Sequence, residues 1–291
     1  MARKPEKKKK VVETTGHEWD GITELNNPMP RWWLWTFYLT IIWGIGYVIA
    51  YPAWPLINGA TPGLLGYSSR AEVAADIAAV NAENAPLNNR IVSLDLAAIA
   101  GDDEVGAYAV SAGGAVFRTF CIQCHGAGAA GVEGFYPNLR DDDWLWGGDI
   151  DAIYTTISHG IRADEDDDTR LSEMPVFGDD YLSHEEIDQA AQFVLSLSGR
   201  ATDAALVAEG AVVFEDNCSS CHGEDGTGDI SVGAPNLADA LWLYGGDLET
   251  VTETITNSRG GVMPAWSTVG RLNEAQLRQV AVYVHELGGG E

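Results

Sequence analysis

One uninterrupted apolar run stands out near the N-terminus of the chain. Residues 32–51 contain no charged side chain, and about twenty such residues cross a hydrocarbon core of about 30 Å as a helix. Tryptophans stand at its start, and Tyr51 and Trp54 at its end, as an aromatic belt requires. A cleaved signal peptide would need a shorter, less acidic leader and a small-residue cleavage site. We therefore expect one retained transmembrane helix within residues 31–54.

Beyond this run, apolar positions recur at the spacing of amphipathic helices, and strand signals are nearly absent. The pattern and its start and stop signals predict helices over residues 107–120, 187–197, 204–217 and 273–288. Ser183 and Glu186 form a capping box before the second of these. A further helix is expected over residues 72–82, which Pro86 would break. The pattern predicts an all-α fold.

Residues 201–291 repeat the pattern of residues 104–200. Pro137–Leu139 corresponds to Pro235–Leu237, and Trp144–Asp149 corresponds to Trp242–Asp247. Such self-similarity predicts two consecutive domains of about ninety residues each. The expected divisions are an N-terminal segment, the transmembrane helix, a tether and the two domains, at residues 1–30, 31–54, 55–103, 104–200 and 201–291.

All four cysteines lie in two copies of the pattern C-x-x-C-H, at residues 121–125 and 218–222. This pattern is typical of covalent haem c attachment, in which two thiols add to the haem vinyl groups and the histidine binds the iron. We expect two haem groups. The attachment residues are Cys121, Cys124, Cys218 and Cys221, and the proximal ligands are His125 and His222. The weaker alternative is one zinc ion held by the two C-x-x-C pairs.

Two methionines follow the motifs at matching places. Met174 and Met263 each precede a proline and, two residues further on, an aromatic residue. A thioether on such a fixed backbone can supply the sixth iron ligand, which closes the site and favours electron transfer. Core filling is the alternative role for a methionine. The spacing does not show which methionine serves which haem, because adjoining domains could exchange these loops.

Charge is distributed unevenly along the chain. The formal net charge is -26, yet every lysine lies within the first ten residues, at Lys4 and Lys7 to Lys10. The positive-inside rule places that end in the cytoplasm and the remainder beyond the membrane, in the periplasm of a bacterium. The acidic remainder excludes nucleic acid as a partner. It either solvates the surface or steers a basic cytochrome c donor.

Three other features have no assigned role. His159 precedes Met174 closely enough to compete as a ligand, although the second repeat has Asn257 at that point. Residues 164–168 form an acidic insertion, read as a solvated loop rather than a calcium site. Candidate partners for the haem propionates are Arg118, Arg140, Arg162 and Arg259.

Taken together, these features resemble subunit III of cbb3-type cytochrome c oxidases, the CcoP or FixP family, with class I cytochrome c domains. Residues 15–22 and 26–33, before the apolar run, carry the more specific part of the resemblance. The resemblance implies that electrons pass from a periplasmic cytochrome c through this chain and a monohaem subunit to the catalytic subunit, which reduces oxygen. The chain alone is expected to have no oxidase activity.

Two other functions remain open. One is a free-standing, membrane-anchored dihaem carrier for other redox enzymes. The other is a dihaem peroxidase that uses His159 as an exchangeable ligand.

Overall fold

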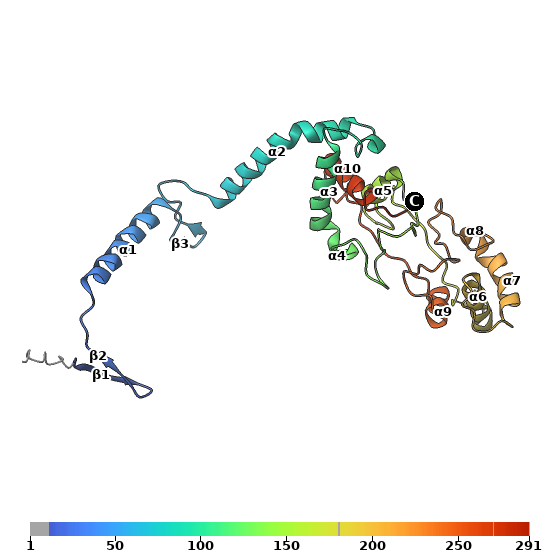
Figure 1. Ribbon diagram of the computed structural model, residues 1–291, viewed down its shortest axis with the longest axis horizontal. Coiled ribbons are helices and arrows are strands. Elements are labelled where there is room, and N and C mark those ends of the chain that lie inside the picture. The colour runs from blue at the N-terminus through green and yellow to red at the C-terminus, as the bar shows by residue number, and fades with distance from the viewer. Residues whose placement is uncertain (1–11, 180, 270, 291) are drawn as a thin grey trace, which may run out of the picture. The chain divides into compact units, whose positions relative to one another are not determined.

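The computed structural model describes residues 12–179, 181–269 and 271–290, and helices make up most of its regular secondary structure (Figure 1). The chain divides into two compact units, residues 1–82 and residues 83–291. Lys4 and Lys7 to Lys10, on which the expected orientation depends, lie outside the described residues.

The first unit contains the expected apolar helix, α1, Arg31–Ala50. Among the described residues it is the one helix long and apolar enough to cross a membrane. The unit also contains two short hairpins that were not expected, β1 (Thr14–Trp19) with β2 (Ile22–Leu25), and β3 (Pro55–Leu56) with β4 (Gly59–Ala60).

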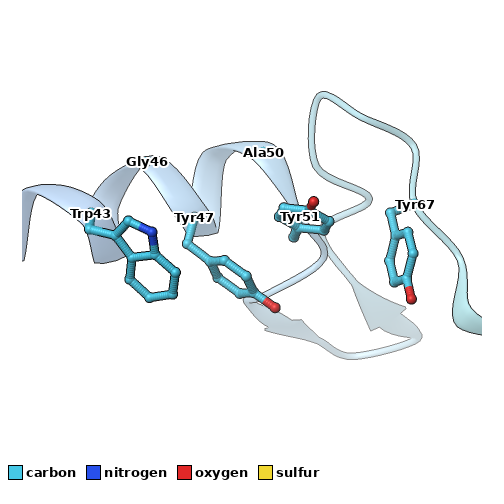
Figure 2. Close-up of a pocket in the computed structure, with 6 residues that line it drawn as sticks. All are labelled: Trp43, Gly46, Tyr47, Ala50, Tyr51 and Tyr67. Atoms are coloured by element: carbon cyan, nitrogen blue, oxygen red, sulfur yellow. The ribbon is translucent and has the colours of Figure 1, made fainter. Parts of the chain in front are cut away.

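Aromatic side chains line one side of α1 near its C-terminal end. The rings of Trp43, Tyr47 and Tyr51 stack at centroid distances of 5.3 and 4.9 Å, and Tyr67 meets Tyr51 edge-on at 5.4 Å. Figure 2 shows these rings along an open groove that also includes Gly46 and Ala50. The groove is confined to the first unit and contains no residue of the cysteine motifs.

Helix α2, Ser69–Ser93, continues through Pro86, so the predicted break is wrong. The residues that follow Pro86 are held by the rest of the second unit, because Asn88 Oδ1 accepts hydrogen bonds from Tyr108 (3.0 Å) and Gln279 (2.8 Å). Ile91 is fully buried in the same region. These contacts offset the backbone hydrogen bond that a proline removes from a helix. The later part of the expected tether is therefore packed into the compact unit.

The second unit continues with a short 3-10 helix, η1, and eight α-helices. Their bounds are Leu96–Ala98 (η1), Gly106–Phe120 (α3), Ile122–His125 (α4), Ile150–His159 (α5), His184–Leu197 (α6), Val207–Asn217 (α7), Ser219–His222 (α8), Leu248–Asn257 (α9) and Glu274–His285 (α10). Four of the helices predicted after the membrane segment are thus confirmed as α3, α6, α7 and α10, and the helix expected over residues 72–82 is part of α2. The capping box of Ser183 and Glu186 is present.

Helices α5 and α9 were not predicted. Asp149 and Asp247 cap them, since each carboxylate accepts a hydrogen bond from the backbone of the first turn. Both aspartates close the repeated Trp-x-x-Gly-Gly-Asp segment. This cap, followed by apolar residues four positions apart, was the signal available in the sequence.

The long helices pair across the two repeats. Helix α3 packs against α10, and α6 packs against α7, while α5 and α9 complete the respective pairs (Figure 1). The described residues form three apolar clusters in two bodies. One body, here called the split body, joins residues 83–170 to residues 259–290 and contains two of the clusters. The other, the continuous body, comprises residues 171–258 and contains the third. The bodies therefore do not follow the expected division after residue 200, because each one combines the beginning of one repeat with the end of the other.

A glycine marks each helix crossing. A Cβ atom at Gly113 of α3 would overlap the backbone carbonyl of Gln279 in α10, and one at Gly210 of α7 would overlap that of Gln189 in α6. Gly113 and Gly210 occupy the same position in the two repeats. Since only glycine permits such a close approach of two backbones, both helix pairs have the same contact at their centre.

Candidate haem-binding sites

The first cysteine motif follows α3 directly. Cys121 ends α3, and the single turn of α4 places His125 beside the loop that begins at Pro137. His125 Nδ1 lies 3.2 Å from the Pro137 carbonyl oxygen. Because a carbonyl can only accept, Nδ1 carries the hydrogen and Nε2 keeps its lone pair for a metal. A backbone carbonyl of this kind is a common partner of iron- or zinc-binding histidines.

The second motif has the same geometry. Cys218 ends α7, α8 forms the turn, and His222 Nδ1 lies 3.1 Å from the Pro235 carbonyl oxygen. Pro137 and Pro235 are corresponding residues of the repeats. The two histidines are therefore oriented by the same hydrogen bond, and both present Nε2 as the free nitrogen.

Burial sets the protonation of both motifs. It lowers the pKa of His125 and of His222, so both rings are neutral and able to act as ligands at neutral pH. Burial likewise raises the pKa of the Cys121 and Cys218 thiols to about 11. All four motif cysteines are free thiols, without a disulfide between them.

Met263 lies with the first motif. It packs on the core that contains Phe117, as Cys121 does. Its backbone pairs with Ile161 through two hydrogen bonds of 3.0 Å each. Three residues further on, Trp266 meets Phe120 of α3 edge-on at 5.6 Å. The C-terminal methionine is therefore part of the split body, together with His125.

Met174 lies with the second motif. It packs on the core of the continuous body, as Cys218 does. Ser258, just after α9, donates its hydroxyl hydrogen to the Met174 carbonyl at 2.7 Å, and Gly178 N donates to the Thr256 carbonyl at 2.9 Å. The structure thus gathers the expected site residues into two sets with the methionines exchanged between repeats. One set is Cys121, Cys124, His125 and Met263, and the other is Cys218, Cys221, His222 and Met174.

Buried donors near the repeated tryptophan segment fit the carboxylates of a haem. The Nε1 atoms of Trp146 and Trp242 and the Nε atom of Arg170 are buried and have no hydrogen-bond partner among the described residues. The guanidinium of Arg170 lies 5.1 Å from the Trp146 ring centre, and that of Arg200 lies 5.1 Å from the Trp242 ring centre. Unpaired buried donors are costly, so an anionic acceptor such as a propionate suits both places.

Two of the arginines named from the sequence have other partners among the described residues, one of them an aromatic ring of the same repeated Trp-x-x-Gly-Gly-Asp segment. Arg162 donates to the backbone carbonyls of Gly261 and Ser172, at 2.7 Å each. Arg259 lies over the Tyr244 ring. Arg200 was missed because its approach to Trp242 depends on packing between the repeats, and Arg170 was missed because its approach to Trp146 depends on the path of the loop after α5. Spacing along the chain reveals neither.

His159 lies on the side of Met263 rather than Met174. It ends α5, and its Nδ1 atom is 3.2 Å from an Asp166 carboxylate oxygen. The neighbouring Ser158 carbonyl accepts hydrogen bonds from the backbone and hydroxyl of Ser267. Four of the five residues of the insertion at 164–168 are solvent-exposed, as expected of a solvated loop, whereas the Asp166 side chain turns inward toward α5 and the Met263 segment.

Repeated haem c motifs on paired helices, preceded by one apolar helix long enough to span a membrane, define a membrane-associated c-type cytochrome. A family described as "Cytochrome C oxidase, cbb3-type, subunit III" matches residues 109–194 and 205–284. The "N-terminal domain of cytochrome oxidase-cbb3, FixP" matches residues 11–58. The two segments of the first match confirm the tandem cytochrome c repeat.

Similar proteins agree over the full length. The CcoP subunit of the cbb3-type oxidase of Cereibacter sphaeroides is 62% identical over 293 residues, which is 100% of both chains. CcoP of Rhodobacter capsulatus is 55% identical over 299 residues, again 100% of both. FixP of Rhizobium meliloti is 54% identical over 280 residues, 96% of both. This chain belongs to the subunit III family of cbb3-type cytochrome c oxidases, whose members are haem c electron-transfer subunits of that complex.

Proposed function

We propose that this chain binds two haem c groups and relays electrons from a periplasmic cytochrome c, through a monohaem subunit, to the oxygen-reducing catalytic subunit of a cbb3-type oxidase. The observation that carries the proposal is the equivalence of the two sites. Each has two free cysteines, a histidine oriented through Nδ1 by a proline carbonyl, and a methionine packed on the same core. Two equivalent sites suit transfer of one electron at a time along the chain.

Covalently bound haem c supplies a one-electron carrier whose potential is set by its axial ligands and surroundings. The residues of this chain fix those surroundings. His125 and His222 supply one ligand each from rings held in a single tautomer. Met263 would close the first site and Met174 the second, which leaves no open position for oxygen or peroxide. The chain alone is therefore expected to have no oxidase activity.

The carboxylates of the two groups would be held by the buried tryptophan N–H groups and by the arginines that lie over the two rings. Trp146 and Arg170 are placed for one carboxylate, and Trp242 with Arg200 for another. Hydrogen bonds from such donors to an anion are about twice as strong as those between neutral groups.

The proposed orientation is single-pass in a bacterial inner membrane, with the N-terminus in the cytoplasm and both haem sites in the periplasm. The lysine-rich first ten residues support the orientation, and the aromatic residues at the ends of α1 support the membrane span itself.

Purification of the complex tests the function. Native membranes are solubilised gently, the chain is captured by a tag, and the haem types, copper and oxygen uptake from reduced cytochrome c are measured. We expect b-type haem and copper to copurify with oxygen uptake. Recovery of c-type haem alone would favour the free-standing carrier, and peroxide turnover by the isolated chain would favour the peroxidase.

The number of haem groups has a direct test. Replacement of Cys121 and Cys124 by alanine is expected to lower the haem c content from two per chain to one, and replacement of Cys218 and Cys221 to do the same. A content of one in the unaltered chain would contradict the proposal.

A further inference from the structure

The acidic insertion of the first repeat, residues 164–168, reaches a segment about one hundred positions away. Glu165 Oε1 accepts a hydrogen bond from the backbone N–H of Ala265 at 3.1 Å, and Asp166 Oδ2 accepts one from the Thr268 hydroxyl at 2.8 Å. Both donors belong to the segment that carries Met263, here called the Met263 loop, residues 261–268. Two carboxylates of the insertion thus hold the loop just beyond the methionine.

Asp166 is the centre of this contact. Its side chain is only 8% exposed, and it also accepts the backbone N–H of Asp168 at 2.8 Å and lies 3.2 Å from His159 Nδ1. The hydrogen bond from Thr268 is the main cause that lowers its pKa, so the carboxylate is charged at neutral pH. Bonds to a charged acceptor that is almost fully buried are stronger and more directional than those between neutral groups.

Among the described residues, no carboxylate from outside the Met174 segment is hydrogen-bonded to it. Around Met174 the contacts to the continuous body are made by backbone groups and by the Ser258 hydroxyl. The insertion is absent from the second repeat. The two methionine segments are therefore held by different means, although the two histidines are held alike.

We propose that Glu165 and Asp166 are positioning residues that keep Met263 at the sixth position of the iron bound by His125. The proposal rests on the proposed ligation of that iron by Met263. Pro264 stiffens the link between the methionine and Ala265, so a hold on the Ala265 amide restricts the thioether. The insertion selectively stabilises methionine ligation at the first site, and the second site does not depend on it.

The test uses the full-length, haem-loaded chain in detergent, separated from the other subunits, with Met174→Ala as the background. In that background the long-wavelength charge-transfer band of a methionine sulfur on ferric haem reports on Met263 alone. We expect Glu165→Ala combined with Asp166→Ala to reduce this band by more than half, with haem c content and helical content unchanged. Asp167→Ala is the matched control, since Asp167 is exposed and its side chain makes no hydrogen bond with another described residue; it should leave the band intact.

A more conservative pair of variants distinguishes the loss of one hydrogen bond from a loss of the fold. Thr268→Val removes only the hydroxyl and should weaken the band, while Thr268→Ser should restore it. With Met174 intact, the reduced double variant should bind carbon monoxide at one haem per chain, while the unaltered chain should bind none. An unchanged band and no carbon monoxide binding in the double variant would overturn the positioning role. If Met263→Ala also left the band intact, the ligation itself would be refuted, which separates the two failures.

Discussion

A single hydrogen bond decides which nitrogen of each motif histidine faces the haem site. At His125 and at His222, a proline carbonyl holds Nδ1 and frees Nε2. The sequence predicts the histidine from C-x-x-C-H, and the repeated Pro-Asn-Leu segment is also visible there. The link between the two is a fact of three-dimensional packing that the sequence does not show.

A tryptophan comparison tests the proposed propionate contacts. Trp242→Phe removes a buried N–H that has no partner among the described residues. In the haem-loaded chain we expect a lower reduction potential at one haem and a loss of about 1 kcal/mol in the free energy of unfolding, because a charged acceptor loses a donor. Potentiometric titration and denaturant unfolding measure the two effects.

Trp144→Phe is the matched control for that comparison. Its Nε1 atom already donates to the Asp141 carbonyl at 2.8 Å. We expect it to lower the stability of the chain without moving either potential. Equal shifts of potential in the two variants would contradict the propionate assignment.

At the scale of helices, the apolar stripe of α10 was predictable, but its partner was not. Leu277, Val280 and Val284 are buried as their spacing predicts. The repeats are so alike that α10 suits α3 or α7 equally well, with a glycine at either crossing. The choice is made by contacts from α2 and the residue after it, since Gln279 donates to Asn88, and Arg278 donates to the Leu94 carbonyl at 2.9 Å. Those contacts lie in a segment that the sequence marked as a tether.

Pro86 in α2 is a second place where tertiary contacts decide what the sequence alone does not predict. Proline inside a helix costs about 3 kcal/mol, so the sequence alone predicts a break. Packing of the residues that follow it against α3 and α10 compensates for that cost. A prediction based on local helix preference does not include the stabilisation that this packing supplies.

A glycine substitution tests the crossing of α3 and α10. Alanine usually favours a helix over glycine by up to about 1 kcal/mol. Gly113→Ala should nevertheless destabilise the haem-loaded chain by about 1–3 kcal/mol, because its Cβ overlaps the Gln279 carbonyl. Gly101→Ala, where no atom lies near the added Cβ, is the control and should change little. Denaturant unfolding measures both, and equal stability of the two variants would argue against this helix pairing.

At the scale of the whole haem-bearing unit, the chain passes from one body to the other twice. The passages lie near residues 170 and 258, and Arg162 contacts the segments beside both, through the Ser172 and Gly261 carbonyls. The two bodies also meet where Gly134 N donates to the Leu243 carbonyl at 2.7 Å. The continuous body is thus inserted within the split body, and the two cannot separate by opening one linker.

A carboxylate at this contact should make stability depend on pH. Burial, and then the charges of Asp239 and Asp141, raise the pKa of Asp143 to about 6. The folded state therefore binds this proton more tightly than the unfolded state does, so the stabilisation is complete below about pH 4 and is lost as the pH rises through about 6. Asp143→Asn should remove that part of the pH dependence of the melting temperature. An unchanged profile would contradict the assignment.

The net charge of -26 should govern the encounter with a basic cytochrome c. Opposite charges speed association at low ionic strength, and salt screens them over about 10 Å at 0.1 M. We expect the second-order rate of electron transfer from a basic cytochrome c to fall at least tenfold between about 0.01 M and 0.5 M salt, measured by stopped flow. An acidic cytochrome c is the control, and its rate of electron transfer should not fall as salt is added. A salt-independent rate with the basic donor would mean that the acidic surface only solvates.

The exchange of methionines between repeats is the central claim, and paired ligand substitutions in the full-length, haem-loaded chain test it most directly. The number of haem groups that retain the sulfur–iron charge-transfer band is counted per chain. His125→Ala with Met263→Ala is predicted to leave one intact histidine–methionine site, because both ligands are removed from the same haem. His125→Ala with Met174→Ala is predicted to leave none. The reverse result, with the intact site surviving only in the second variant, would contradict the exchanged packing and restore the sequential pairing.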